Sequence, residues 1–303
     1  MLETLDRSQN TAIKVIGVGD CGGDAINHMM FHGLRGADFT VIDTKAQVLN
    51  HCQTPTHLHI EGMISKNICA DARRTNAIAE RIKVLIGDAS LIFIIAEMGS
   101  GNELATIVAQ IARELKILTV AIITQPSSPE EKRKINFNES IKVMLGNVDS
   151  LIVVPNSSSM EQPDHGTLKN MGATHDLMMR AVACIAEDLN GHGLINLDFE
   201  EALELLSNTG LAVVGTGLAS GVDRAREASE LAIMQSGAAK LSSARQVLVT
   251  ITASTLQMPE LDTVLKRIQS ATQESIFTIS SPVFDEAMGN ELRVTILATG
   301  INT

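Results

Sequence analysis

The amino-acid sequence predicts an α/β fold with a parallel sheet in its amino-terminal part, a buried central helix and a smaller carboxy-terminal α/β part. Three observations lead to this prediction. Short apolar strands alternate with helical segments up to residue 154, which is typical of a parallel sheet covered by helices on both faces. Residues 174–190 then leave almost no polar face, as expected of a buried helix. A second, shorter series of strands and helices follows residue 203.

The individual elements follow from the period of the apolar residues. In the amino-terminal part the predicted strands are residues 12–18, 39–43, 57–60, 91–96, 118–124 and 150–154, the third being a short edge strand. The predicted helices there are residues 24–33, 46–50, 75–86, 102–115 and 139–145. In the carboxy-terminal part we expect helices at residues 199–206, 221–234 and 259–270, and strands at residues 246–253, 275–280 and 291–299.

The chain is organised around the central helix and the loop after it. Thr174 or His175 can begin this helix, and the glycines that follow Asn190 end it. The helix should therefore be a rod of roughly 24 Å. An acid stands near each end of the unit, Asp176 at the start and Asp198 in the loop that follows. We expect a strut between two domains with an acidic site at each end. The predicted division is residues 1–173, 174–202 and 203–303.

Composition excludes several classes of function. The formal net charge is −11, which argues against a general nucleic-acid binder because phosphate neutralisation needs clustered Lys and Arg. No apolar run approaches the ~20 residues of a spanning helix, and the amino terminus does not resemble a signal peptide. The chain has 4 Cys with no CxxC spacing. We therefore expect a cytoplasmic protein with free thiols, no direct membrane insertion and no metal site built from its own side chains.

A glycine-rich loop follows the first predicted strand. Gly17, Gly19 and Gly22 give the pattern GxGxxG, and Asp43 ends the next strand. This arrangement is typical of dinucleotide binding, in which glycines allow close approach of the backbone, a helix N-terminus faces the pyrophosphate and the acid binds ribose hydroxyls. The alternative is a tight strand–helix turn without a ligand. From these residues alone the two interpretations are about equally favoured.

Segments along nearly the whole chain resemble one family. They are IKVIGVGDCGGDA, IDTKAQVL, ILTVAIITQP, VDSLIVVPN, GLINLDF, GTGLASGVDRAREASELAI and ELRVTILATG. In this order they resemble FtsZ, the bacterial tubulin-like division GTPase. The resemblance implies a Rossmann-like GTPase domain, a central helix and a smaller α/β domain. It also implies head-to-tail stacking, with the loop after the central helix facing the nucleotide of the next subunit.

The resemblance implies GTP or GDP as the ligand, with Mg²⁺ as a possible companion. The positions of this chain that match nucleotide-binding positions are Gly17, Gly19, Gly22, Gly23, Asp43, Thr44, Gly99, Gly101 and Asp176. A dinucleotide-dependent oxidoreductase would give no reason for the second half of the chain.

The sequence departs from the family pattern around the nucleotide. Residues 97–104 read EMGSGNEL where the family has the phosphate-binding GGGTGTG, and MISKNICADARR replaces a second glycine-rich loop. Asp20 and Cys21 stand where the family has glycine, so a Cβ blocks the backbone and a carboxylate repels phosphate. Lys45 replaces an Asp, and His175 replaces an Asn that reads the guanine. We therefore expect weak nucleotide binding.

The loop after the central helix keeps its acids. Asn196, Asp198 and Glu201 match the family's inter-subunit catalytic loop, in which carboxylates polarise the attacking water on a neighbour's nucleotide. The alternative is structural, since Asp198 and Glu201 also have the spacing of a capping box at a helix start.

Three functions remain open. The first is a divergent FtsZ-like protein with a degenerate GTP site that stacks head to tail with itself or with a conventional FtsZ and modulates filaments. The second is an active FtsZ-type GTPase that forms its own filaments. The third is a dinucleotide-dependent oxidoreductase that uses the GxGxxG loop. Nucleotide analysis of the purified protein would distinguish them.

Overall fold

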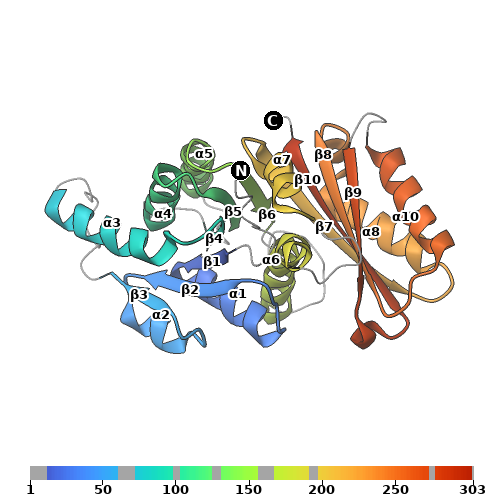
Figure 1. Ribbon diagram of the computed structural model, residues 1–303, viewed down its shortest axis with the longest axis horizontal. Helices are drawn as coiled ribbons and strands as arrows, with labels where there is room; N and C mark the ends of the chain where they lie inside the picture. Colours follow the sequence, from blue (N-terminus) through green and yellow to red (C-terminus); the bar gives the residue numbers. More distant parts are fainter. Residues whose placement is uncertain are drawn as a thin grey trace, which may run out of the picture.

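The computed structural model describes residues 12–60, 72–97, 103–124, 131–155, 167–190, 197–272 and 277–301. The strands in these ranges form one 10-stranded sheet in the order β3-β2-β1-β4-β5-β6-β7-β10-β8-β9. Figure 1 shows this sheet running across the molecule, with the amino-terminal strands at one end and the carboxy-terminal strands at the other. Among the helices that the structure describes, none is long and apolar enough to cross a membrane.

The amino-terminal strands are all parallel. They are β1 (Ile13–Val18), β2 (Asp38–Asp43), β3 (His57–His59), β4 (Leu91–Glu97), β5 (Leu118–Thr124) and β6 (Ser150–Val154). The central β4 and β5 are buried along nearly their whole length, as expected of strands that are covered on both faces. Each predicted strand of the amino-terminal part is confirmed to within about a residue, because apolar runs of this kind have few alternative structures.

Helices cover both faces of this parallel part. They are α1 (Gly19–Phe31), α2 (Ala46–His51), α3 (Ala72–Ile86), α4 (Glu103–Glu114) and α5 (Glu131–Leu145). One hydrophobic core includes side chains of α1 and of the central helix, and the core on the opposite face includes side chains of α3, α4 and α5. Helix α1 begins earlier than predicted, because the glycine-rich stretch forms its first turns rather than a loop.

The central helix α6 (Thr167–Leu189) has 23 residues. It begins before the predicted Thr174 and is about 34 Å long at 1.5 Å per residue. Its apolar side chains are buried against α1 and against strands of the carboxy-terminal part. A helix buried in this way contacts both parts of the molecule. Helix α7 (Phe199–Leu206) follows.

The sequence analysis missed the strand that joins the two parts. β7 (Gly210–Ser220) pairs in parallel with β6 and antiparallel with β10, so the sheet is continuous. Two glycines, Gly215 and Gly217, interrupt the apolar pattern of this strand. The packing of α8 on the strand accounts for both of them. A Cβ on Gly215 would lie 2.4 Å from the carbonyl oxygen of Ala232, and one on Gly217 would lie 2.0 Å from that of Ala228. Helix α8 therefore packs directly on the β7 backbone.

The carboxy-terminal elements form a third core. They are α8 (Arg224–Ser236), α9 (Ala238–Leu241), β8 (Gln246–Ala253), α10 (Met258–Ala271), β9 (Phe277–Phe284), the 3₁₀ turn η3 (Glu286–Met288) and β10 (Glu291–Ile301). Helix α8 lies on β7 and β10, and α10 packs against α8. Figure 1 shows α8 and α10 along the orange and red strands, away from α1 and α2.

Candidate functional site

The carboxyl ends of five parallel strands meet at one edge of the sheet, and three of the predicted nucleotide residues, Gly19, Asp43 and Thr44, lie there. β1, β2, β4, β5 and β6 pair in parallel register, so the residues that follow each strand share that edge. The described residues at this carboxyl edge are Gly19, Asp20, Cys21, Asp43, Thr44, Lys45, Glu97 and Thr124. Gly99 and Gly101 lie outside the described residues.

The glycine stretch is a tight junction between β1 and α1. A Cβ on Gly17 would lie 2.4 Å from the carbonyl oxygen of Gly22, and one on Gly22 would lie 2.6 Å from that of Ile95. Packing of α1 against β1 and β4 therefore requires both glycines. Gly23 is buried in the same helix. Only Gly19 of this group differs, because its φ is 76° and nothing lies within 4 Å of its Cβ position.

An ion pair joins the beginning of α1 to the end of β2. Lys45 Nζ lies 2.9 Å from Asp20 Oδ2. The Lys45 backbone N–H donates to Asp43 Oδ1 at 2.6 Å, so the Asp43 carboxylate, which is 4% exposed, binds its own loop rather than facing outward. The carbonyl oxygen of Thr44 lies 3.2 Å from His59 Nε2. The sequence analysis treated Asp20 as an unpaired charge and missed its partner, which is 25 residues away in the chain.

The described side chains at this edge carry more negative than positive charge. Asp20, Asp43 and Glu97 are acidic, and Lys45 is the only basic side chain among the described residues that directly follow these strands. In the described ranges no group of three or more His, Cys, Asp or Glu side chains could hold a metal ion. The backbone around Gly19, at the start of α1, fits a phosphate. The described side chains do not fit the charge of a triphosphate.

Cys21 lies inside this edge and is not a nucleophile. Its Sγ is 3.8 Å from Thr124 Oγ1. Burial and, to a lesser extent, the nearby carboxylates of Glu97, Asp24 and Asp20 raise the pKa of the Cys21 thiol to about 11, against the opposing hydrogen bond to Thr124. The thiol therefore stays protonated at neutral pH.

A second group of side chains meets near the start of the buried part of α6. Asp176 Oδ1 lies 3.3 Å from Arg180 Nη2, so the predicted base-binding acid already has a partner. His175 is 8% exposed, and its ring lies 6.0 Å from that of His28 on α1. His28 in turn lies 4.3 Å from His32 between ring centroids. Burial lowers the pKa of both His28 and His175. These contacts depend on the packing of α1 against α6 and could not be predicted from sequence spacing.

The chain enters and leaves the α7 region at the opposite end of the parallel strands. Asn190 Nδ2 at the end of α6 donates to the carbonyl oxygen of Gly36, just before β2 begins, and β7 starts beside Ser150 at the beginning of β6. Asp198 and Glu201 cap α7 in a capping box. The structural interpretation of these two acids is therefore present in the molecule, and their catalytic role stays a prediction. Asn196 lies outside the described residues.

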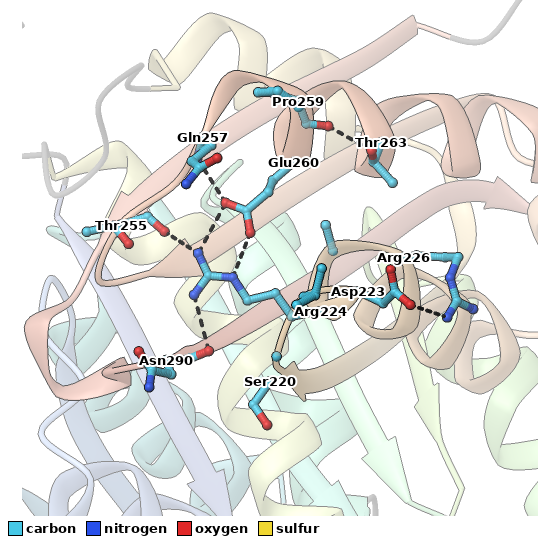
Figure 2. A pocket seen from close by; sticks show the side chains of 13 residues that line it. Ser220, Asp223, Arg224, Arg226, Thr255, Gln257, Pro259, Glu260, Thr263 and Asn290 are labelled. Carbon is cyan, nitrogen blue, oxygen red and sulfur yellow. Dashed lines mark hydrogen bonds and ion pairs between the residues drawn. The ribbon is translucent and has the colours of Figure 1, made fainter.

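The carboxy-terminal part contains a separate pocket of about 760 Å³. It lies where β7 meets α8 and β8 meets α10, and Figure 2 shows Arg224 at its centre. The Arg224 guanidinium binds Glu260 through Nε at 2.7 Å and through Nη2 at 3.1 Å. It also donates to the carbonyl oxygens of Thr255 and Asn290. The central charges of this pocket are thus paired with each other and tie three loops together.

Comparisons with known proteins give matches for both parts of the chain. A model of the Tubulin/FtsZ family, GTPase domain, matches residues 12–163, and a model of the FtsZ family, C-terminal domain, matches residues 210–302. Cell division protein FtsZ of Wigglesworthia glossinidia brevipalpis is 34% identical over 315 residues, with coverage of 99% of this chain and 82% of that protein. Cell division protein FtsZ of Pseudomonas aeruginosa is 36% identical over 316 residues, with coverage of 99% and 80%.

Solved structures give the same result at the level of the fold. An empty FtsZ dimer of M. jannaschii matches with a TM-score of 0.85 and 26% identity, over 97% of this chain and 89% of that chain. A GTPgS-bound protofilament of CetZ2 from Haloferax volcanii matches with a TM-score of 0.70 over 96% of this chain and 93% of that chain, and its 17% identity supports the fold alone.

Proposed function

The chain belongs to the tubulin/FtsZ family, and from that membership we propose that it is a divergent FtsZ-like subunit with one weakened and one retained contact surface. The weakened surface is the carboxyl edge, where the family's GTPase domain places its nucleotide. The retained surface is the acidic loop before α7. Such a subunit would serve cell division by joining filaments of a conventional FtsZ rather than by building long filaments of its own.

The observation that supports a weakened nucleotide surface is the arrangement of charge at the carboxyl edge. Asp43 accepts a hydrogen bond from its own loop and is buried, so little of its carboxylate is exposed to a ribose. The side chain of Lys45 is paired with Asp20. A triphosphate approaching this edge therefore meets carboxylates before it meets an unpaired cation. We infer that GTP or GDP binds weakly, with or without Mg²⁺.

The retained surface is supported by the geometry of the acidic loop. Asp198 is exposed and begins α7, and the chain on both sides of α7 lies at the end of the parallel strands opposite the glycine stretch. The similar FtsZ structure of M. jannaschii is described as a dimer. A head-to-tail contact of this kind pairs two unlike surfaces and propagates only if each subunit offers both. A subunit with one good surface joins a filament end and then offers a poor surface to the next arrival.

A second candidate function is an active GTPase that forms its own filaments. It is favoured by the match to the GTPase domain over residues 12–163 and by the open backbone at Gly19. The dinucleotide-dependent oxidoreductase has no comparable support, because the family accounts for both parts of the chain and Asp43 is held by its own loop.

The two candidates differ in an assembly experiment. We would add this protein in sub-stoichiometric amounts to a conventional FtsZ with GTP and follow light scattering and phosphate release. The proposal predicts a lower scattering plateau with the wild type and no effect with Asp198→Asn, which removes the charge. Long GTP-dependent filaments formed by this protein alone would establish the second candidate instead, and unchanged assembly with the wild type would refute the capping role.

A further inference from the structure

The Lys45–Asp20 ion pair is exposed and therefore weak. The two side chains are 62% and 65% exposed, and the Nζ–Oδ2 distance is 2.9 Å. Ion pairs in water contribute little, because solvent screens the attraction and two long side chains must be ordered. An anion that carries several charges can therefore compete with the single carboxylate of Asp20 for the Lys45 ammonium group.

The backbone of Lys45 is held in place, whereas the exposed pair with Asp20 is the contact that holds its ammonium group. The Lys45 N–H is bound by Asp43 at 2.6 Å, and the preceding carbonyl oxygen of Thr44 contacts His59. The four-carbon stem of a lysine can move its ammonium group by several ångström without any change in the main chain. Asp20 raises the pKa of Lys45, so the group stays charged.

We propose that Lys45 is the cation that binds phosphate at the carboxyl edge. Without a ligand its ammonium group is paired with Asp20, and binding of a polyphosphate breaks the Lys45–Asp20 pair. The positive charge is then supplied by the chain itself. Polyphosphate binding should accordingly depend little on Mg²⁺. This inference rests on the proposed function in one respect, namely that nucleotide binds weakly at this edge.

A double-mutant cycle tests the proposal. We would titrate GTP, and separately inorganic tripolyphosphate, into the wild type, Asp20→Asn, Lys45→Gln and the double variant, each in EDTA and in Mg²⁺. The control is Asp262→Asn, because Lys266 and Asp262 form an equally exposed pair at 2.6 Å on α10, away from the carboxyl edge. Circular dichroism melts of all variants check that folding is unchanged.

The expected order of affinities for polyphosphate follows from competition between Asp20 and the ligand for Lys45. Asp20→Asn should bind about five-fold more tightly than the wild type, and Lys45→Gln about five-fold more weakly. The gain from Asp20→Asn should be at least about two-fold larger when Lys45 is present than in the Lys45→Gln background. Asp262→Asn should bind like the wild type, and Mg²⁺ should change wild-type affinity by less than about two-fold.

Several outcomes would overturn the proposal. Equal gains in the two backgrounds would mean that Asp20 acts only by repulsion. A large requirement for Mg²⁺, or no binding by any variant, would show that Lys45 does not replace a metal ion. The result is also separable from the proposed function. If the order of affinities fails while the protein still limits conventional filaments, only the role of Lys45 is wrong. If filaments are unaffected while the order holds, the capping function is wrong.

Discussion

Asp198 and Glu201 cap α7 reciprocally. The Glu201 N–H donates to Asp198 Oδ1 at 2.8 Å, and the Asp198 N–H donates to Glu201 Oε2 at 3.0 Å. The same two carboxylates that the family resemblance assigns to inter-subunit work therefore also fix the start of a helix. A rigid helix start holds the Asp198 side chain in one orientation, which is what a contact with a neighbouring subunit requires.

The two roles of Asp198 can be separated by substitution. Asn also caps helices well, so Asp198→Asn should leave the melting temperature nearly unchanged, whereas Asp198→Ala should lower the free energy of unfolding by about 1 kcal/mol. Both variants should lose the effect on a conventional FtsZ. Denaturant unfolding and light scattering measure the two properties. If Asp198→Asn kept its full effect on assembly, the carboxylate would have only a structural role.

The close packing of α8 on β7 gives a second prediction. A Cβ on Gly217 would lie 2.0 Å from the carbonyl oxygen of Ala228, so Gly217→Ala should lower the free energy of unfolding by at least about 2 kcal/mol. Gly172→Ala is the matched control, because nothing lies within 4 Å of its Cβ position in α6. Alanine is a better helix former, so this variant should gain up to about 1 kcal/mol. Similar losses for both would contradict the packing argument.

Much of the fold was predictable because the strands are apolar on both faces. β4 and β5 are mostly apolar runs, and such runs have few alternative structures. β7 was not predictable from its own residues. Gly215 and Gly217 interrupt its apolar pattern. Both positions require glycine because the backbone of α8 lies against them, and the spacing of apolar residues in the sequence does not reveal this contact. The early start of α1 was missed for a similar reason, since its glycines are typical of loops until the approach to β1 is known.

The candidate site was predictable in position but not in its internal contacts. The GxGxxG stretch and Asp43 do lie at one edge of the sheet, as their places after parallel strands require. The pairing of Lys45 with Asp20 joins two different loops, and the sequence does not indicate that these two charges lie close together. The histidine cluster likewise exists only because α1 packs against α6.

The Arg224–Glu260 pair gives a third prediction, which concerns stability. Their side chains are 10% and 19% exposed, and Figure 2 shows the guanidinium enclosed by the groups it binds. Arg224→Ala leaves a partly buried carboxylate without its partner and should cost about 2 kcal/mol in the free energy of unfolding. Arg226→Ala is the control, because the Arg226 pairs are more exposed, and it should be nearly neutral.

The same pair predicts that the stability of the protein falls at acidic pH. Arg224 holds the pKa of Glu260 below its usual value. A carboxylate whose pKa is lower in the folded state stabilises the protein above its unfolded pKa of about 4.3 and loses that contribution as pH falls through the folded value. Glu260→Gln should therefore flatten the loss of stability below about pH 4.3. An unchanged pH profile of denaturant unfolding would contradict this pairing.

The cluster of His28, His32 and His175 should make the stability of the protein depend on pH in a higher range than Glu260 does. Burial lowers the pKa of His28, with further lowering from His32, His175 and Arg180 against the opposing Asp176. Burial also lowers that of His175, against the opposing Asp24. Histidines held neutral in the folded state contribute full stability above about pH 6.5 and lose it as pH falls toward their folded values.

A double substitution tests this dependence. His28→Gln with His175→Gln should make the melting temperature less dependent on pH between about 6.5 and 5, while His57→Gln, at an exposed edge-strand position, should not. If the double variant followed the wild-type profile, these two rings would not be the titrating groups.

The central claim is that this subunit has one competent surface and one weak surface. The most direct measurement is the position of a fluorophore attached to its amino terminus in filaments of a conventional FtsZ imaged with GTP. We predict label at one end of each filament only, filaments that shorten as more protein is added, and loss of end labelling with Asp198→Asn. Label distributed along the filaments, or filaments that neither shorten nor carry label, would contradict the claim.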